Sequence, residues 1–161
     1  MQWHRSHWRS RIMKGIRRFD EFLKENIVKK QGIDRSRIGF LIKESEKSYH
    51  NMLNMVEKLK VDDDSANLFV KSCHDILMEL IRAKMLSAGY NASGFGAHEA
   101  EVSYMRVLGF SEKEVQFADQ IRFFRNGILY YGTQLDKDYA EKVISFTKEI
   151  YPKLKELLKN I

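Results

Sequence analysis

A short segment in the second half of the chain concentrates the side chains best suited to chemistry. Residues 122–132 read Arg-Phe-Phe-Arg-Asn-Gly-Ile-Leu-Tyr-Tyr-Gly, so two guanidinium groups, an amide and two phenols share one otherwise apolar stretch. Arginine is rarely buried without a partner, and its planar head binds phosphate or carboxylate oxygens through paired hydrogen bonds. The segment therefore predicts either an anion-binding site or a set of structural ion pairs.

A helical phase of about 100° per residue places the polar members of this segment along one stripe. Arg122, Asn126 and Tyr130 follow one another at four-residue intervals, which puts them on one face of a helix. Arg125 lies at the flank of this stripe, and its long side chain can bend toward the same surface. These four side chains are the candidate site.

Helical phase excludes one residue of the segment from the candidate site, and nearby acidic residues offer its arginines a structural role. Tyr131 lies seven residues after Phe124, nearly eclipsing it, so we expect Tyr131 to be a core aromatic. Asp75, Glu79 and Asp119 could pair with the arginines from neighbouring helices. On the stripe alone, such structural ion pairs are the simpler interpretation.

The segment resembles the signature of the HEPN family, small helical proteins known for nucleotide binding and RNA cleavage. In that signature an Arg, usually followed by a polar residue, precedes a His by four to six residues. Arg125 and Asn126 match, whereas Tyr130 stands where the His is expected. The resemblance extends over about residues 59–161 and includes residues 77–84 with Gly89-Tyr90, His98-Glu99-Ala100, Leu108-Gly109-Phe110, residues 138–141 and residues 151–154.

The resemblance implies roles for individual residues. Family members pair as homodimers whose signature helices face each other across a cleft, and they act on RNA without a metal. Arg125 would stabilise phosphate charge with Arg122 as an auxiliary, and Asn126 would orient the pair. A free phenol ionises near pH 10, so Tyr130 is a poor base at neutral pH. His98, in the first turn of a predicted short helix, is the candidate substitute.

Three functions follow from these residues. The leading hypothesis is a homodimer that binds nucleotide or RNA in an arginine-lined cleft without efficient cleavage, beside a minimal nucleotidyltransferase as in some toxin–antitoxin pairs. The first alternative is a metal-independent endoribonuclease that uses Arg125, Asn126 and Tyr130, with or without His98. The second is a structural dimerisation or adaptor module, in which the aromatic side chains of the segment form the interface. We expect no cofactor and no bound metal.

The elements that must position these residues are predicted to be helices throughout. Apolar residues recur at three- and four-residue steps, and no strand alternation is apparent. Capping residues and glycines delimit helices at about residues 11–30, 34–59, 66–88, 97–108, 112–132 and 137–159. Short connections favour an all-α, antiparallel up-and-down bundle of five to six helices. We divide the chain into a basic N-terminal arm and helix (1–33) and a HEPN-like bundle (34–161).

Composition narrows the class of protein. The 161 residues are 43% hydrophobic with no apolar run long enough to span a bilayer, and we expect a cytoplasmic protein without membrane contacts. The lone Cys73 fits a reducing compartment. The net charge of +6 resides in residues 1–30, which carry nine Lys and Arg against three Asp and Glu; residues 31–161 carry 19 of each. Arginines and aromatics within residues 3–11 could contact nucleic acid, although a solvated terminus is the simpler interpretation.

Overall fold

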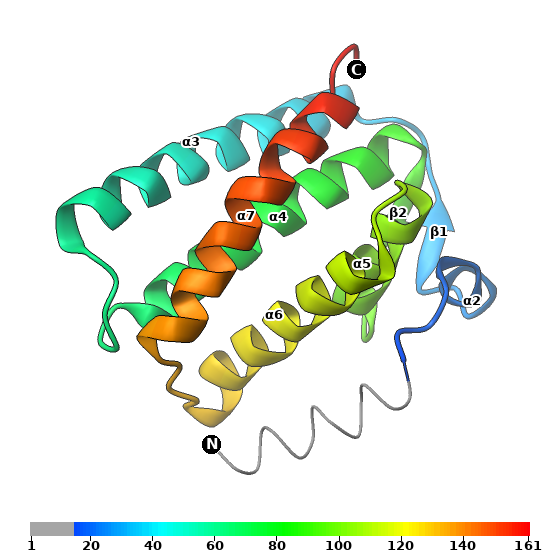
Figure 1. Ribbon diagram of the computed structural model, residues 1–161. Helices are drawn as coiled ribbons and strands as arrows, with labels where there is room; N and C mark the ends of the chain where they lie inside the picture. Colours follow the sequence, from blue (N-terminus) through cyan, green and yellow to red (C-terminus); the bar gives the residue numbers. More distant parts are fainter. Residues whose placement is uncertain (1–14) are drawn as a thin grey trace.

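The computed structural model describes residues 15–161 and confirms an all-α bundle (Figure 1). The predicted contacts of residues 3–11 lie outside this range. The elements in chain order are α2 (Phe19–Lys24), β1 (Val28–Lys30), α3 (Arg35–Leu59), α4 (Ala66–Ser87), β2 (Tyr90–Ala92), α5 (Ala97–Val107), α6 (Glu112–Tyr131) and α7 (Lys137–Leu157). Figure 1 shows α3 and α4 running in opposite directions, as do α6 and α7.

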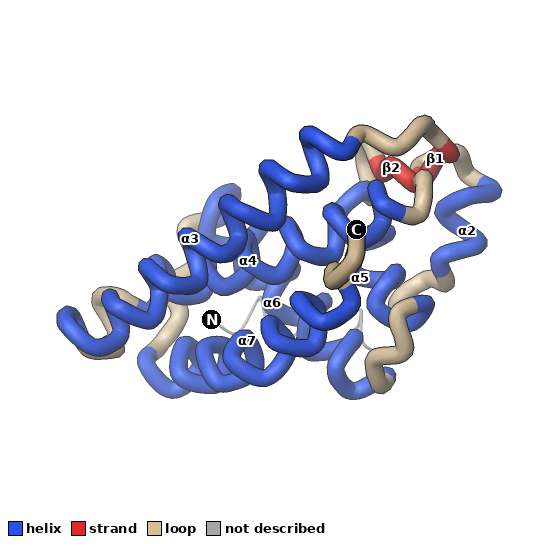
Figure 2. Tube along the Cα trace, turned by 90° about the horizontal axis from the view of Figure 1, so that it is seen from above, coloured by secondary structure: helices blue, strands red, loops and turns tan. Residues whose placement is uncertain are grey.

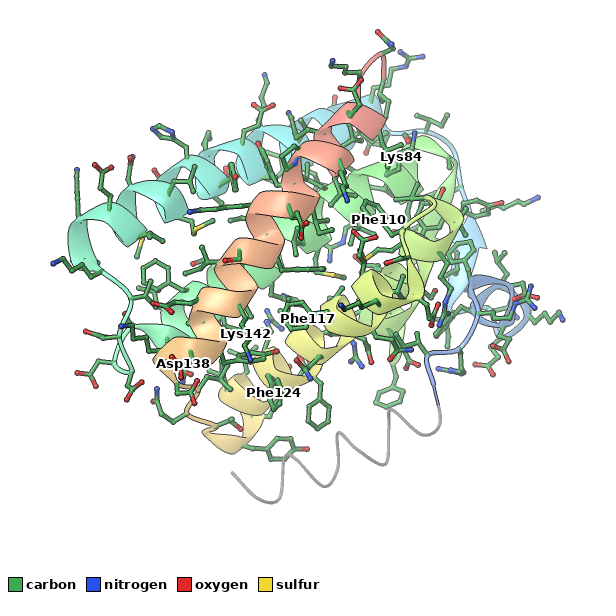
Figure 3. All side chains as sticks on the ribbon, in the orientation of Figure 1. Lys84, Phe110, Phe117, Phe124, Asp138 and Lys142 are labelled. Atoms are coloured by element: carbon green, nitrogen blue, oxygen red, sulfur yellow. The ribbon has the colours of Figure 1, made fainter. Side chains whose placement is uncertain are left out.

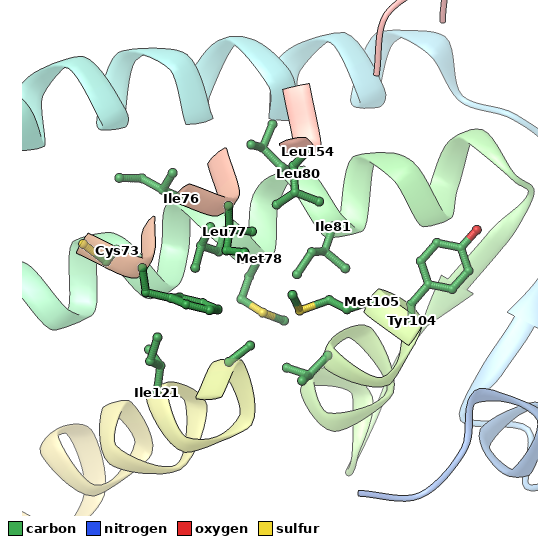
Figure 4. Close-up of a cluster of buried hydrophobic side chains, with 14 of the residues drawn as sticks. Cys73, Ile76, Leu77, Met78, Leu80, Ile81, Tyr104, Met105, Ile121 and Leu154 are labelled. Atoms are coloured by element: carbon green, nitrogen blue, oxygen red, sulfur yellow. The ribbon is translucent and has the colours of Figure 1, made fainter. Parts of the chain in front are cut away.

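Helix α4 is the central element of the bundle and contacts α3, α5, α6 and α7. Its sequence is apolar on nearly every side, which is typical of a helix surrounded by protein. Figure 4 shows its side chains meeting Met105 of α5, Ile121 of α6 and Leu154 of α7. Polar residues on α4 are therefore placed at the junctions with its neighbours.

The starts of α3, α6 and α7 follow local capping chemistry, as the sequence predicts, whereas no side chain caps the start of α4 or α5. Asp34 accepts a hydrogen bond from the Arg37 backbone at 3.0 Å, and Asp136 accepts one from the Tyr139 backbone at 2.8 Å. Ser111 and Glu114 form the expected reciprocal capping box at the start of α6. These hydrogen bonds fix the first residues of α3, α6 and α7.

The predicted helix over residues 11–30 is confirmed only at Phe19–Lys24: residues 15–18 and the residues beyond Lys24 are not part of it, and residues 11–14 lie outside the described range. Asn26 adopts a left-handed backbone conformation with φ 59°, which ends the helix, and Val28–Lys30 pairs in antiparallel register with Tyr90–Ala92. Figure 2 shows this small sheet beside α2 at one end of the bundle. The expected absence of strands is also wrong, because a three-residue strand carries too little alternation to recognise.

The connection between α6 and α7 is fastened to the start of α4. The Asn67 side chain donates to the Thr133 carbonyl at 2.9 Å and accepts from the Leu135 backbone N–H at 2.9 Å. Asp63, within the acidic run before α4, accepts from the Lys137 backbone at 2.8 Å. These contacts hold the end of α6 against the bundle.

Aromatic rings join α6 to α7 on the face of α6 that turns toward α7. The ring centroids of Phe117 and Phe146 are 4.8 Å apart, and those of Phe124 and Tyr139 are 5.1 Å apart, both in edge-on contact. Figure 3 labels Phe117 and Phe124. Gln120 also faces α7, since its Oε1 accepts a hydrogen bond from the Tyr139 hydroxyl, whereas Arg125 faces α4. Across residues 15–161, no helix combines the length and apolar character needed to cross a membrane.

Candidate functional site

The last two turns of α6 present Arg125, Asn126 and Tyr130 to solvent to different extents. The Arg125 side chain is 23% exposed, Asn126 is half-buried, and Tyr130 is 73% exposed. The guanidinium of Arg125 lies 3.7 Å from the Asp75 carboxylate of α4. Arg125 therefore lies beside Asp75 with part of its side chain exposed.

Arg122 lies inside the protein instead of on the exposed part of the stripe. Its Nε donates to Asp119 at 2.8 Å, and both residues are buried. Its Nη2 atom is buried and finds no hydrogen-bond acceptor among the described residues. An ion pair buried this deeply depends on each partner, because removal of one leaves the other charge uncompensated.

Tyr131 is exposed, and its prediction as a core aromatic is wrong. Its side chain is 67% exposed, like that of its neighbour Tyr130. The helical phase of residues 124 and 131 is as expected, but the last turn of α6 extends past the packed core before Gly132 ends the helix in a left-handed conformation. Leu129 is exposed in the same turn, so this end of α6 is an apolar and aromatic surface.

A histidine from α4 connects the arginine of α6 to α5. His74 is buried, and its Nδ1 lies 3.1 Å from the carboxylate of Asp75, which also faces Arg125. Its ring stands nearly perpendicular to that of His98, with centroids 6.4 Å apart. Burial lowers the pKa of His74 and outweighs the opposing hydrogen bond to Asp75, so we assign a neutral ring with the proton on Nδ1.

A second group is centred on the buried carboxylate of Glu101 in α5. Both of its oxygens are paired: Oε2 accepts from Nε of Arg82 at 3.0 Å, and Oε1 lies 3.3 Å from both Nη2 of Arg82 and Nδ1 of His98. Glu101 is 3% exposed, whereas His98 is about half exposed. Glu101 thus fixes two polar head groups, one from α4 and one from α5, near the surface.

The two groups form one network, which we call the three-helix cluster. It links α4, α5 and α6 through the contacts between His74 and His98 and between Asp75 and Arg125, and it consists of His74, Asp75, Arg82, His98, Glu101 and Arg125.

Glu79 of α4 adjoins the cluster, and its pKa is raised to about 7. Partial burial is the main cause, and the nearby charges of Asp75 and Glu44 add to it, while Arg82 opposes. Its Oε2 atom is buried without a hydrogen-bond partner among residues 15–161. A carboxyl group that is protonated near neutral pH adds little negative charge to this surface.

Of the predicted residues, the structure brings Arg125 and His98 into one cluster and leaves Tyr130 at the exposed end of α6. Asp75 and Asp119 each lie beside one arginine, although Asp119 belongs to the same helix as Arg122. No three His, Cys, Asp or Glu side chains gather as metal ligands within the described range. Chemically, the arrangement offers the guanidinium groups of Arg82 and Arg125 and the half-exposed imidazole of His98 to an anion.

Sequence reasoning missed His74, Arg82 and Glu101 as parts of the site. The signals were present: Asp75 and Arg82 are seven residues apart on α4, and His98 and Glu101 are three apart on α5, which places each pair on one face. What joins these residues is the crossing of three helices.

Comparison with protein-family models, with curated proteins and with solved structures finds no match to this chain.

Proposed function

We propose that this protein is a HEPN-type helical homodimer that binds a nucleotide or RNA segment through Arg125, Asn126 and Tyr130 without efficient cleavage. The observation that carries the proposal is the environment of Arg125, whose guanidinium lies 3.7 Å from Asp75 while its side chain stays partly exposed. A guanidinium held in this way can exchange a weak carboxylate contact for a phosphate.

The replacement of the signature histidine supports binding over catalysis. Tyr130 supplies an aromatic face and a hydroxyl to a ligand, and bases stack well on exposed aromatic rings. In this proposal Arg122 does not contact the ligand. It pairs with the buried Asp119 of the same helix and stabilises the structure of α6.

Two partners belong to the proposal. A second copy would meet the exposed end of α6 and complete the cleft, and a separately encoded minimal nucleotidyltransferase would act beside the dimer. A cytoplasmic location also belongs to the proposal, and it is supported by the single cysteine of the chain, Cys73, which is a free thiol.

The decisive test is the substitution Arg125→Ala, followed by binding of a labelled nucleotide and a short single-stranded RNA at fixed low salt. We expect both affinities to fall about tenfold, because a charge-assisted hydrogen bond is lost. Arg37→Ala, which removes an exposed arginine at the start of α3, is the matched control. Equal affinities for wild type and Arg125→Ala would refute the proposal.

The endoribonuclease alternative is favoured by one observation, the proximity of His74 and His98 to each other and to Asp75 and Arg125. An imidazole can take up and release a proton near neutral pH. Removal of the proton from the 2′-hydroxyl requires a group of this kind. RNA cleavage in EDTA that disappears in Arg125→Ala would establish this alternative. RNA that stays intact at full binding would exclude it.

A further inference from the structure

The arginine that carries the proposed function lies beside a row of acidic side chains on α4. Asp75 lies 3.7 Å from the guanidinium of Arg125, and Glu79 follows Asp75 by four residues, which places both carboxyl groups on one face of the helix. The side chain of Asp75 is 52% exposed, and Glu79 is half-buried. A phosphate bound to Arg125 would therefore meet one carboxyl group directly and a second one a helical turn away.

The cations of the three-helix cluster are already matched by carboxylates. Arg82 donates two hydrogen bonds to the buried Glu101, from Nε at 3.0 Å and from Nη2 at 3.3 Å. Asp75 faces Arg125. Burial lowers the pKa of His74 and leaves its ring neutral. The two guanidinium groups are thus balanced by two carboxylates, and a ligand with several negative charges finds no surplus of positive charge among them.

Asp75 is a fixed negative charge in this site. Its Oδ1 lies 3.1 Å from Nδ1 of His74 and is the same oxygen that faces Arg125. Partial burial opposes the ionisation of Asp75, but the hydrogen bond from His74 and the charge of Arg125 outweigh it, so that the pKa of Asp75 is lowered. A ligand phosphate must compete with this carboxylate for Arg125.

Glu79 contributes a negative charge that depends on pH. Its Oε2 is buried and has no hydrogen-bond partner among the described residues. Partial burial, and then the charges of Asp75 on α4 and Glu44 on α3, raise its pKa to about 7 against the opposing charge of Arg82. Glu44 in turn lies 3.3 Å from Lys47 of its own helix. Glu79 is therefore mostly protonated at pH 6 and mostly charged at pH 8.

We propose that Asp75 and Glu79 are specificity-determining residues, which limit the Arg125 site to a phosphate with one negative charge and so select an internal phosphodiester of RNA over a free nucleotide. The inference rests on the proposed function, in which Arg125 binds the phosphate. A phosphodiester carries one negative charge, whereas a phosphate monoester carries about 1.5 to 2 at neutral pH. Repulsion by a carboxylate grows with the charge of the ligand, so these acids weaken the binding of a nucleotide more than that of a phosphodiester.

The test measures binding of ApA, AMP and ATP to the full chain by calorimetry at fixed low salt without Mg²⁺. We expect ApA to bind wild type more tightly than ATP, and the reverse order would overturn the proposal. Asp75→Asn should raise ATP affinity about threefold to tenfold and ApA affinity less, because it removes a repelling charge and keeps the shape of the side chain. Glu149→Gln, at an exposed position of α7, is the matched control and should bind like wild type.

The contribution of Glu79 is measured with ApA at pH 6 and pH 8, because the charge of a phosphodiester does not change in this range. At pH 8 wild type should bind ApA about twofold to fivefold more weakly than Glu79→Gln does, while at pH 6 the two proteins should bind it nearly equally. Comparison at the same pH removes the effect of His98 and other groups that both proteins share. Equal affinities of the two proteins at pH 8 would exclude a role for Glu79.

The variants also separate this inference from the proposed function. If Arg125→Ala weakens binding of all three ligands while Asp75→Asn and Glu79→Gln leave their relative affinities unchanged, the charge selection is excluded and the proposed function stands. Asp75→Asn that weakens ApA and ATP equally would also exclude it, since that result describes a carboxylate that only positions Arg125. If Arg125→Ala changes no affinity, both proposals fall.

Discussion

At the scale of single residues, the two arginines of α6 have separate environments although they lie one helical turn apart. Arg122 is buried against Asp119, while Arg125 reaches the surface beside Asp75. The sequence could predict carboxylate partners for both arginines, because candidate acids were few. It could not predict which arginine stays accessible, since that depends on how α4 and α5 cover α6.

Glu79 should make the stability of the folded protein depend on pH. Its pKa is raised to about 7 in the folded protein, so the folded state holds a proton that the unfolded state releases near pH 4.5. The unfolding free energy should therefore fall as pH rises from about 4.5 to 7, and Glu79→Gln should be more stable than wild type at pH 8. Allowing for partial exposure, we expect a gain on the order of 1 kcal/mol.

Urea unfolding of both proteins across this pH range measures the effect. Only the difference between the two curves reports on Glu79, because His74 and the other titrating groups affect both proteins alike. A difference that is the same at pH 5 and pH 8 would contradict the assignment.

At the scale of elements, capping chemistry makes the starts of α3, α6 and α7 predictable. Two aspartates and a serine start these helices at the predicted positions, whereas the β1–β2 pairing depends on residues about 60 positions apart. Tyr131 shows the same limit, since helical phase gives a direction but does not tell where the core ends. The three-helix cluster is a product of helix crossing and is equally hidden from local patterns.

The clamp between Asn67 and the α6–α7 connection yields a prediction at this scale. Asn67→Ala removes two hydrogen bonds that fasten Thr133 and Leu135, so we expect a loss of about 1–3 kcal/mol in unfolding free energy. The amide of Leu135 should also exchange its hydrogen faster, because its acceptor is gone. Asn51→Ala, at an exposed position of α3, is the control. Unchanged Leu135 exchange would show that the clamp does not restrain this connection.

At the scale of the whole molecule, the proposed dimer depends on the exposed end of α6. Leu129, Tyr130 and Tyr131 are exposed together there, and aromatic side chains are favoured in protein interfaces. We expect Tyr131→Glu to raise the dimer dissociation constant at least about tenfold, because a charge would be desolvated in the interface. Sedimentation velocity over a range of concentrations measures this.

Phe95→Glu is the matched control for the dimer, because Phe95 is fully exposed in the loop before α5. It should sediment like wild type. If wild type and Tyr131→Glu sediment as the same species at every concentration, the end of α6 is not the interface.

The pairing of β1 with β2 also sets an order of folding. Helices α3 and α4 are neighbours in sequence and in space, so their contact forms with little loss of chain entropy. Strand β1 must wait for a partner about 60 residues later, and closing so long a loop is slow and entropically costly. During synthesis β1 leaves the ribosome before its partner strand β2, and we expect the segment from Gly15 to Lys30 to reach its native place after α3 and α4 have paired.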